Sequence, residues 1–114
     1  MKGDRSFRRL TKARSGGSKH LSLKWRATNS REVRVGIVVN RKVGKAVARN
    51  RVRRRLREAM LSIVRDPKWL PKLATVDGVP SFDAMIVARP SAAEATFHEL
   101  KRSLELAIER GRLS

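Results

Sequence analysis

The sequence predicts a mixed α+β fold, an α/β sandwich in which a helix, two strands, a second helix, a third strand and a final helix follow one another. Two stretches in the first half alternate apolar and polar residues, which is typical of half-buried strands. Two later stretches repeat apolar residues every three or four positions, as helices packed on one side do. Because 40% of the 114 residues are hydrophobic, we expect one domain over 1–114 with one modest core.

We expect the first half of the chain to form a short helix followed by two paired strands. The helix spans 4–14, with Asp4 as its N-cap and the glycine pair 16–17 as its end. Alternation over 20–28 and over 33–39 then predicts two antiparallel strands joined by a short hairpin. A further short strand can lie next to this hairpin.

We expect the second half to contain a long helix, a loop, a buried strand and a last helix. An apolar stripe at helical spacing predicts the long helix over 45–64. Residues 66–81 hold three of the four prolines and are typical of a loop, whereas the apolar run 83–89 suits a strand buried on both faces. A capping-box pattern at 91–94, Ser-Ala-Ala-Glu, predicts the start of the last helix, which continues to Gly111.

Positive charge is concentrated in the first half of the chain. The formal net charge is +18, and residues 1–57 carry 20 Lys or Arg against two acids, whereas 58–114 carry eight of each. This pattern is typical of a polyanion binder, because each neutralised phosphate releases condensed counterions. No stretch approaches the roughly 18 apolar residues that a membrane-spanning helix needs, and no secretion signal is visible. We therefore expect a cytoplasmic protein that binds nucleic acid and no membrane.

The residue inventory offers little for catalysis by the protein itself. The chain has no cysteine, which excludes disulfides, Cys-bearing metal sites and thiol chemistry. It has two histidines, His20 and His98, and no HExxH, Walker or paired acidic motif. His98 lies near acids on the last helix and reads as a solvated surface residue. We expect no catalytic residue, no metal ligand and no cofactor bound by the protein alone.

The run RKVGKAVARNRVRRRLR, residues 41–57, carries nine Lys or Arg and no acid. An apolar stripe through Val52 would anchor this helix on the core. Arg49, Arg53 and Arg57 repel one another at a spacing of four residues, a cost that an external anion would relieve. We therefore favour a phosphate-binding face over an ordinary solvated face, and arginine suits bidentate phosphate recognition. Composition alone does not distinguish RNA from DNA.

Residues 33–60, VRVGIVVNRKVGKAVARNRVRRRLREAM, closely resemble the protein subunit of bacterial ribonuclease P, in which a strand, a KKxG-like turn and an AVxRNRxKR helix follow one another. Weaker resemblance covers 4–16 and the segment from Phe82 onward, so most of the chain is included. The resemblance implies a ribosomal-protein-like α/β sandwich with a left-handed βαβ crossover, although such connections are generally right-handed. It also implies an RNA-binding subunit of an endoribonuclease that removes the 5′ leader of precursor tRNA.

The resemblance implies two RNA-binding surfaces and leaves catalysis to the RNA. The Arg-Asn-Arg helix would bind the ribonuclease P RNA, and a cleft between the first helix and the open face of the sheet would hold the single-stranded leader. The residues expected to bind the RNA subunit are Arg41, Lys42, Lys45, Arg49, Asn50, Arg51, Arg53, Arg54 and Arg57. The residues expected to bind the leader are Phe7, Arg8, Lys12, Lys24, Trp25 and Arg26. Mg²⁺ would be required by the RNA-containing holoenzyme, with no obligate protein partner.

The leader surface departs from the family pattern. Phe7 matches an aromatic residue of the cleft, but Thr11 stands where a second aromatic is common, so the stacking platform is either reduced or supplied by Trp25. Phe7 and Trp25 could equally be core residues. Two other functions stay open at this point, a structural ribosomal protein of related fold and a DNA-binding architectural protein. Neither would restore precursor cleavage to a ribonuclease P RNA.

Overall fold

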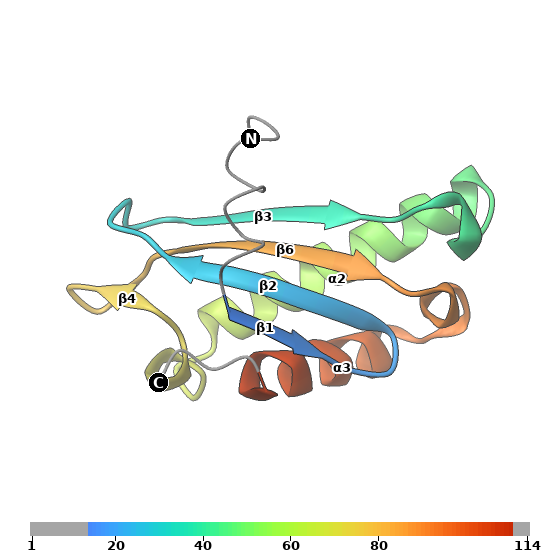
Figure 1. Ribbon diagram of the computed structural model, residues 1–114. Coiled ribbons are helices and arrows are strands. Elements are labelled where there is room, and N and C mark those ends of the chain that lie inside the picture. Colours follow the sequence, from blue (N-terminus) through green and yellow to red (C-terminus); the bar gives the residue numbers. More distant parts are fainter. Residues whose placement is uncertain (1–13, 111–114) are drawn as a thin grey trace.

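The computed structural model describes residues 14–110, which form a four-stranded sheet with two long helices on one face (Figure 1). The elements in chain order are β1 (Arg14–Gly17), β2 (Leu21–Ala27), β3 (Val33–Val38), the 3-10 turn η2 (Arg41–Val43), α2 (Ala46–Arg65), η3 (Leu70–Lys72), β4 (Thr75–Val76), β5 (Val79–Pro80), β6 (Phe82–Ala88), η4 (Pro90–Glu94) and α3 (Phe97–Arg110). Within this range no helix is long and apolar enough to cross a membrane.

The expected helix over 4–14 lies outside the described residues except for Arg14, which begins β1. The glycines at 16–17, expected to end that helix, belong to the same strand and pair with Leu23 and Ser22 of β2. An edge strand needs only its backbone hydrogen bonds to pair, so two glycines are compatible with it. A further short strand was expected near β2 and β3, and β1 lies at the edge of the sheet beside β2.

The prediction that β2 and β3 pair as a hairpin is wrong, because β6 lies between them. The sheet order is β1-β2-β6-β3. Ala84 of β6 faces Trp25 in an antiparallel ladder on one side and Val35 in a parallel ladder on the other. Strands β2 and β3, which alternate apolar and polar residues, flank β6, in which all residues but Met85 and Val87 are buried. A mostly apolar strand belongs at the centre of a sheet, where it loses the most water.

The connection from β3 through α2 to β6 is left-handed. In Figure 1 both strands run to the right, β6 lies below β3, and α2 lies behind the sheet. A connection that leaves the upper strand, passes behind the sheet and returns to the lower strand, with both strands pointing right, is left-handed. Most such connections have the opposite hand. This confirms the crossover that the resemblance implied. It also places both long helices on one face and leaves the other face of the sheet, here called the open face, uncovered by them.

The core lies between the sheet and the two helices. The sheet residues that face the helices include Leu23, Trp25 and Ile86, each with at most 1% of its surface exposed. Ala48, at the start of the apolar stripe expected on α2, is only half-buried. The later members of the stripe are buried, namely Val52, Leu56, Ala59, Met60 and Ile63. Burying each large aliphatic side chain contributes about 1.5–3 kcal/mol, so this interface holds α2 firmly in place.

The last helix begins later than predicted, at a different capping box. The Thr96 amide donates to the Glu99 carboxylate (2.9 Å), and the Glu99 amide donates to the Thr96 hydroxyl (3.1 Å). The predicted box at 91–94 instead lies in η4, where the Ser91 hydroxyl is hydrogen-bonded to Nδ1 of His20 (2.8 Å). Both segments match the capping pattern, but only Thr96 directly precedes the continuous apolar period of the helix.

The segment 66–81 is more ordered than the expected loop. It contains the small hairpin β4–β5, whose turn residues Asp77 and Gly78 both have positive φ (52° and 77°), as a tight two-residue hairpin turn requires. Arg31 forms an ion pair with Asp77 and so ties the hairpin to the β2–β3 connection. Trp69 packs on the body with 8% of its surface exposed. The Asp-Gly pair was the available signal for this hairpin.

Candidate nucleic-acid interface

The turn before α2 and the first part of α2 form a cationic surface. Asn40 begins the turn, and its side-chain oxygen accepts a hydrogen bond from the Lys42 amide (3.0 Å). Lys45 is the N-cap of α2 and makes no capping hydrogen bond with its side chain, and the first turn of the helix has no acidic residue. The positive end of the helix dipole therefore adds to the side-chain charges rather than being offset by them.

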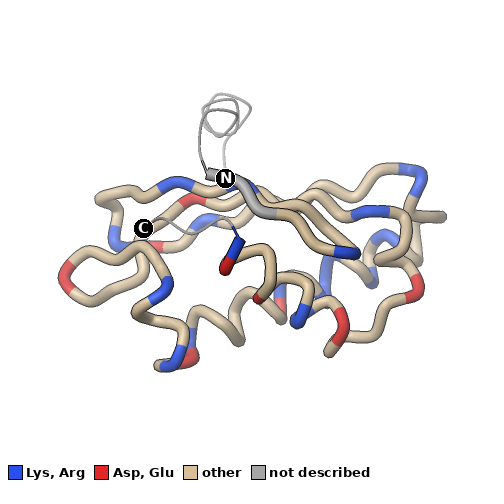
Figure 2. The backbone as a smooth tube through the Cα atoms, turned by 60° about the horizontal axis from the view of Figure 1, so that its bottom comes forward, with Lys and Arg blue, Asp and Glu red and all other residues tan. Residues whose placement is uncertain are grey.

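The residues expected to bind the RNA subunit all lie in η2, at the N-cap of α2 or in α2 between Arg49 and Arg57. Figure 2 marks the Lys and Arg positions of the backbone in blue. The exposed members are Arg41, Lys42, Lys45, Asn50, Arg54 and Arg57. The half-buried members are Arg49, Arg51 and Arg53. We call these nine residues the α2 surface. No ion pair formed within residues 14–110 includes any of its cations.

Two arginines of the α2 surface keep unused hydrogen-bond donors. The Nε atoms of Arg49 and Arg51 are buried and have no acceptor in the described part of the chain. Arg55, which belongs to the same basic run, behaves differently: it donates to the backbone carbonyl of Ala95 (2.7 Å) and joins α2 to the segment before α3. The basic run therefore divides into one arginine that supports the fold and others that remain available to an anion.

The open face of the sheet carries the second set of candidates, but only in part. Lys24 and Arg26 point to this face and are half-buried. Trp25 points the opposite way, with 1% of its surface exposed, and its ring packs edge-on against Phe82 at a centroid distance of 5.2 Å. The expectation that Trp25 stacks on a leader base is therefore wrong, because neighbouring residues of a strand face opposite sides.

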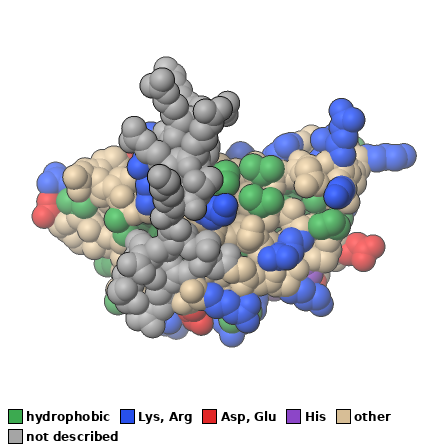
Figure 3. Space-filling model, in the orientation of Figure 1, with side chains coloured by type: hydrophobic (Ala, Val, Ile, Leu, Met, Phe, Trp, Pro, Cys, Tyr) green, Lys and Arg blue, Asp and Glu red, His purple; other side chains and the backbone are tan. Residues whose placement is uncertain are grey.

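The remaining leader candidates, Phe7, Arg8 and Lys12, lie outside residues 14–110. Figure 3 views the open face and shows hydrophobic side chains between Lys and Arg. Among the apolar residues of this face is Val38, with 44% of its surface exposed. Apolar and cationic groups side by side are what a single-stranded nucleic acid requires, because its bases and its phosphates make different contacts.

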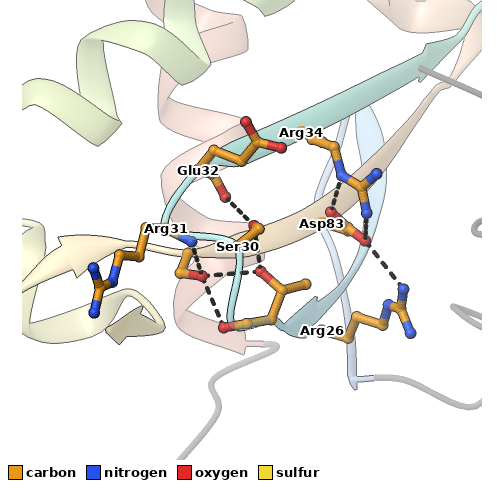
Figure 4. A network of polar contacts seen from close by, with 8 residues as sticks. Arg26, Ser30, Arg31, Glu32, Arg34 and Asp83 are labelled. Atoms are coloured by element: carbon orange, nitrogen blue, oxygen red, sulfur yellow. Dashed lines mark hydrogen bonds and ion pairs between the residues drawn. The ribbon is translucent and has the colours of Figure 1, made fainter. Parts of the chain in front are cut away.

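Sequence reasoning missed two residues of the open face, Arg34 and Asp83. Asp83 is completely buried, and Figure 4 shows it between the guanidinium groups of Arg34 and Arg26. Burial by itself would raise the pKa of Asp83, but hydrogen bonds from Arg34 and Arg26 outweigh it and hold the pKa below the usual aspartate value. An acid inside an otherwise apolar strand was the signal that could have identified this cluster.

The described residues show no arrangement for metal binding. Among residues 14–110 no group of three or more His, Asp or Glu side chains could hold a metal ion. Several of the acids have other roles: Asp83 and Asp77 pair with arginines, and Glu99 caps α3.

Known proteins resemble this chain in sequence and in fold. The model of the family described as "Ribonuclease P" matches residues 1–111. The ribonuclease P protein component of Thermus thermophilus is 42% identical over 113 residues, which are 99% of this chain and 60% of that protein. The chain thus spans less than two thirds of the length of its Thermus relatives. The protein component of Clostridioides difficile is 35% identical over 116 residues, which are 100% of this chain and 92% of that protein.

The structural comparison agrees with the sequence comparison. A mutant of the Staphylococcus aureus RNase P protein superposes with a TM-score of 0.75 at 23% identity, over 96% of this chain and 84% of that one. This likeness confirms the mixed α+β fold. The family match over nearly the whole length and the identity to the Clostridioides difficile component show that the chain belongs to the bacterial ribonuclease P protein family.

Proposed function

We propose that the protein is the RNA-binding subunit of ribonuclease P and acts in the cytoplasm, where it assists removal of 5′ leaders from precursor tRNA. The observation that carries this proposal is the α2 surface, whose cations have no acidic partner within residues 14–110. The side chains of Arg49, Arg53 and Arg57 repel one another unless an anion lies between them. A folded RNA backbone supplies such anions in a fixed array.

The proposal divides the work between the protein and the RNA. The α2 surface binds the catalytic RNA subunit, and the open face binds the single-stranded leader through Lys24, Arg26 and the candidates at Phe7, Arg8 and Lys12. The RNA holds Mg²⁺ and performs the cleavage. The protein contributes phosphate contacts that replace part of the counterion atmosphere, so the folded RNA needs less added salt.

Reconstitution tests this function. The protein is mixed with a bacterial ribonuclease P RNA at a Mg²⁺ concentration too low for the RNA alone, and cleavage of precursor tRNA is followed. We expect the protein to restore cleavage at the mature 5′ end. A control variant, Arg102→Gln, removes an exposed cation of α3 that lies outside both proposed surfaces and is expected to restore cleavage equally well. Absence of cleavage with the wild-type protein contradicts the proposal and favours a purely structural RNA-binding or DNA-binding role.

A further inference from the structure

Three charged side chains on the open face stand in one row across the sheet. Arg26 on β2 and Arg34 on β3 are both register partners of Asp83 on the central strand β6. The three residues come from three different strands, and their side chains meet on the face opposite α2 and α3, as Figure 4 shows. We call them the Arg-Asp-Arg row.

The hydrogen bonds of the row tie both guanidinium groups to Asp83. Arg34 donates from Nε to Oδ1 of Asp83 and from Nη2 to Oδ2, both at 2.8 Å, which is the bidentate arrangement. Arg26 donates from Nη2 to the same Oδ2 at 3.2 Å. The guanidinium of Arg34 is thereby held in one orientation and that of Arg26 is tethered at one end, whereas an exposed arginine samples many rotamers.

The row leaves donors free on the side away from Asp83. None of the hydrogen bonds formed within residues 14–110 uses Nη1 of Arg26 or of Arg34, and Nε of Arg26 is buried with no acceptor among these residues. The arginine side chains retain 30% and 39% of their surface, but Asp83 retains none. The acid is therefore hidden beneath two cations that are themselves partly exposed and whose Nη1 groups remain unused.

A purely structural purpose does not explain this arrangement well. Taking a carboxylate out of water is costly, and an apolar residue would fill the central strand at least as well. One arginine would suffice to neutralise Asp83, yet two are present, so the row keeps a net charge of +1 on the open face. A preformed pair of guanidinium groups, by contrast, is well suited to a phosphodiester, because little side-chain entropy remains to be lost on binding.

We propose that Asp83 is a positioning residue that holds Arg26 and Arg34 as a phosphodiester-binding pair for a single-stranded RNA segment on the open face. This inference rests on the proposed function, in which that segment is the 5′ leader. It adds Arg34 to the leader surface and gives a role to an acid that never touches the RNA. Asp83 acts only through the two arginines.

The direction in which Asp83→Asn changes leader affinity distinguishes a positioning role from a simple effect of charge. Asp83→Asn removes a negative charge from a surface that binds a polyanion, so electrostatics alone predicts tighter leader binding and a steeper salt dependence. Positioning predicts the reverse, because the guanidinium groups lose their anchor. The matched control is Asp77→Asn, which removes another arginine-paired aspartate, that of the exposed Arg31–Asp77 pair in the β4–β5 hairpin. Asparagine tolerates the positive φ at position 77.

The experiment measures leader-dependent affinity in the reconstituted holoenzyme. The ratio of the dissociation constants of mature and precursor tRNA is determined at several salt concentrations for the wild type, Asp83→Asn and Asp77→Asn. We expect Asp83→Asn to lower this ratio about tenfold, the loss of roughly one charge-assisted hydrogen bond, with a shallower salt slope. We expect Asp77→Asn to leave the ratio unchanged. An unchanged or increased ratio in Asp83→Asn overturns the inference.

Two further measurements keep the result interpretable. The near-ultraviolet circular dichroism of buried Trp25 and the affinity for the RNA subunit report whether Asp83→Asn is folded. If it is not folded, Arg34→Lys decides, because it keeps the charge but loses the two-pronged contact: a reduced ratio supports the inference and a wild-type ratio overturns it. If the wild-type protein itself shows no preference for precursor over mature tRNA, it is the proposed function that has failed.

Discussion

The lowered pKa of Asp83 makes the stability of the fold depend on pH. Its pKa is below the usual value of about 3.9, because the hydrogen bonds from Arg34 and Arg26 outweigh the effect of burial. Near pH 4 the unfolded chain therefore binds more protons than the folded chain, and the free energy of unfolding rises with pH. The stabilising contribution is complete above the unfolded pKa and is lost as the pH falls through the folded pKa.

We expect the wild-type protein to lose stability when the pH is lowered from neutral to about 3, and Asp83→Asn to lose less over the same interval. Urea unfolding at several pH values, followed by circular dichroism, measures the difference. Asp77→Asn again serves as the control, because its exposed pair contributes little. A pH dependence in Asp83→Asn as steep as in the wild type would show that this carboxylate does not contribute to acid unfolding.

At the residue scale, sequence patterns predicted exposure better than they predicted partners. Alternation along β2 already separated Trp25 from Lys24 and Arg26, and the structure keeps them on opposite faces. The assignment of Trp25 to the leader surface failed because it followed the need for an aromatic residue rather than this alternation. The partners of Asp83 could not be predicted, since they lie on strands far apart in the sequence and meet only through the sheet order.

At the element scale, the two long helices were predicted well and their ends less so. The apolar period of α2 and α3 is long and regular, which makes helices the most predictable elements. The start of α3 was assigned to the wrong capping box, because 91–94 and 96–99 both match the pattern and local sequence does not rank them. The hairpin β4–β5 was not predicted, because the three prolines in 66–81 indicated a loop.

The capping box of α3 can be tested by a double-mutant cycle. Thr96→Ala is expected to cost about 1 kcal/mol of stability, and its combination with Glu99→Ala should be less than additive because the two side chains cap each other's amides. The same cycle at Ser91 and Glu94 is the control and should be additive. Urea unfolding gives all the values. Coupling at Ser91 and Glu94 instead would restore the capping box expected from the sequence.

Substitution of two adjacent arginines of α2 should affect different properties, RNA affinity in one case and stability in the other. Arg54 is exposed, so Arg54→Gln should weaken binding to the RNA subunit and reduce the salt slope by about one, with little change in stability. Arg55 donates to the Ala95 carbonyl, so Arg55→Gln should cost about 1.5–3 kcal/mol of stability with a smaller effect on RNA affinity. Filter binding and urea unfolding measure the two quantities. If both variants lost RNA affinity equally, the division of the basic run would be incorrect.

At the scale of the whole molecule, charge works against folding. The chain carries a net charge of +18, and the α2 surface has no acidic partner within residues 14–110. Folding brings these cations together, so self-repulsion lowers stability until anions bind. Anions that bind the folded state more strongly than the unfolded state stabilise it by mass action.

We expect sulfate to raise the melting temperature more than chloride does at equal ionic strength, because a divalent oxyanion can bridge the arginines of the α2 surface. A gain of 1 kcal/mol corresponds to roughly 4–8 °C for a domain of this size. A variant with Arg49 and Arg53 changed to Gln should lose most of the difference between the two salts. If it keeps the difference, sulfate stabilises the protein by general exclusion from its surface and not by binding this site.

The topology of the sheet has a consequence for the newly made chain. Arg26 and Asp83 are 57 positions apart, and β3 has no strand partner until β6 exists. During synthesis the ribosome therefore releases the 20 cations of residues 1–57 before the central strand can close the sheet. Until β6 has been made, these cations belong to a nascent segment that lacks its central strand, and the sheet can close only afterwards.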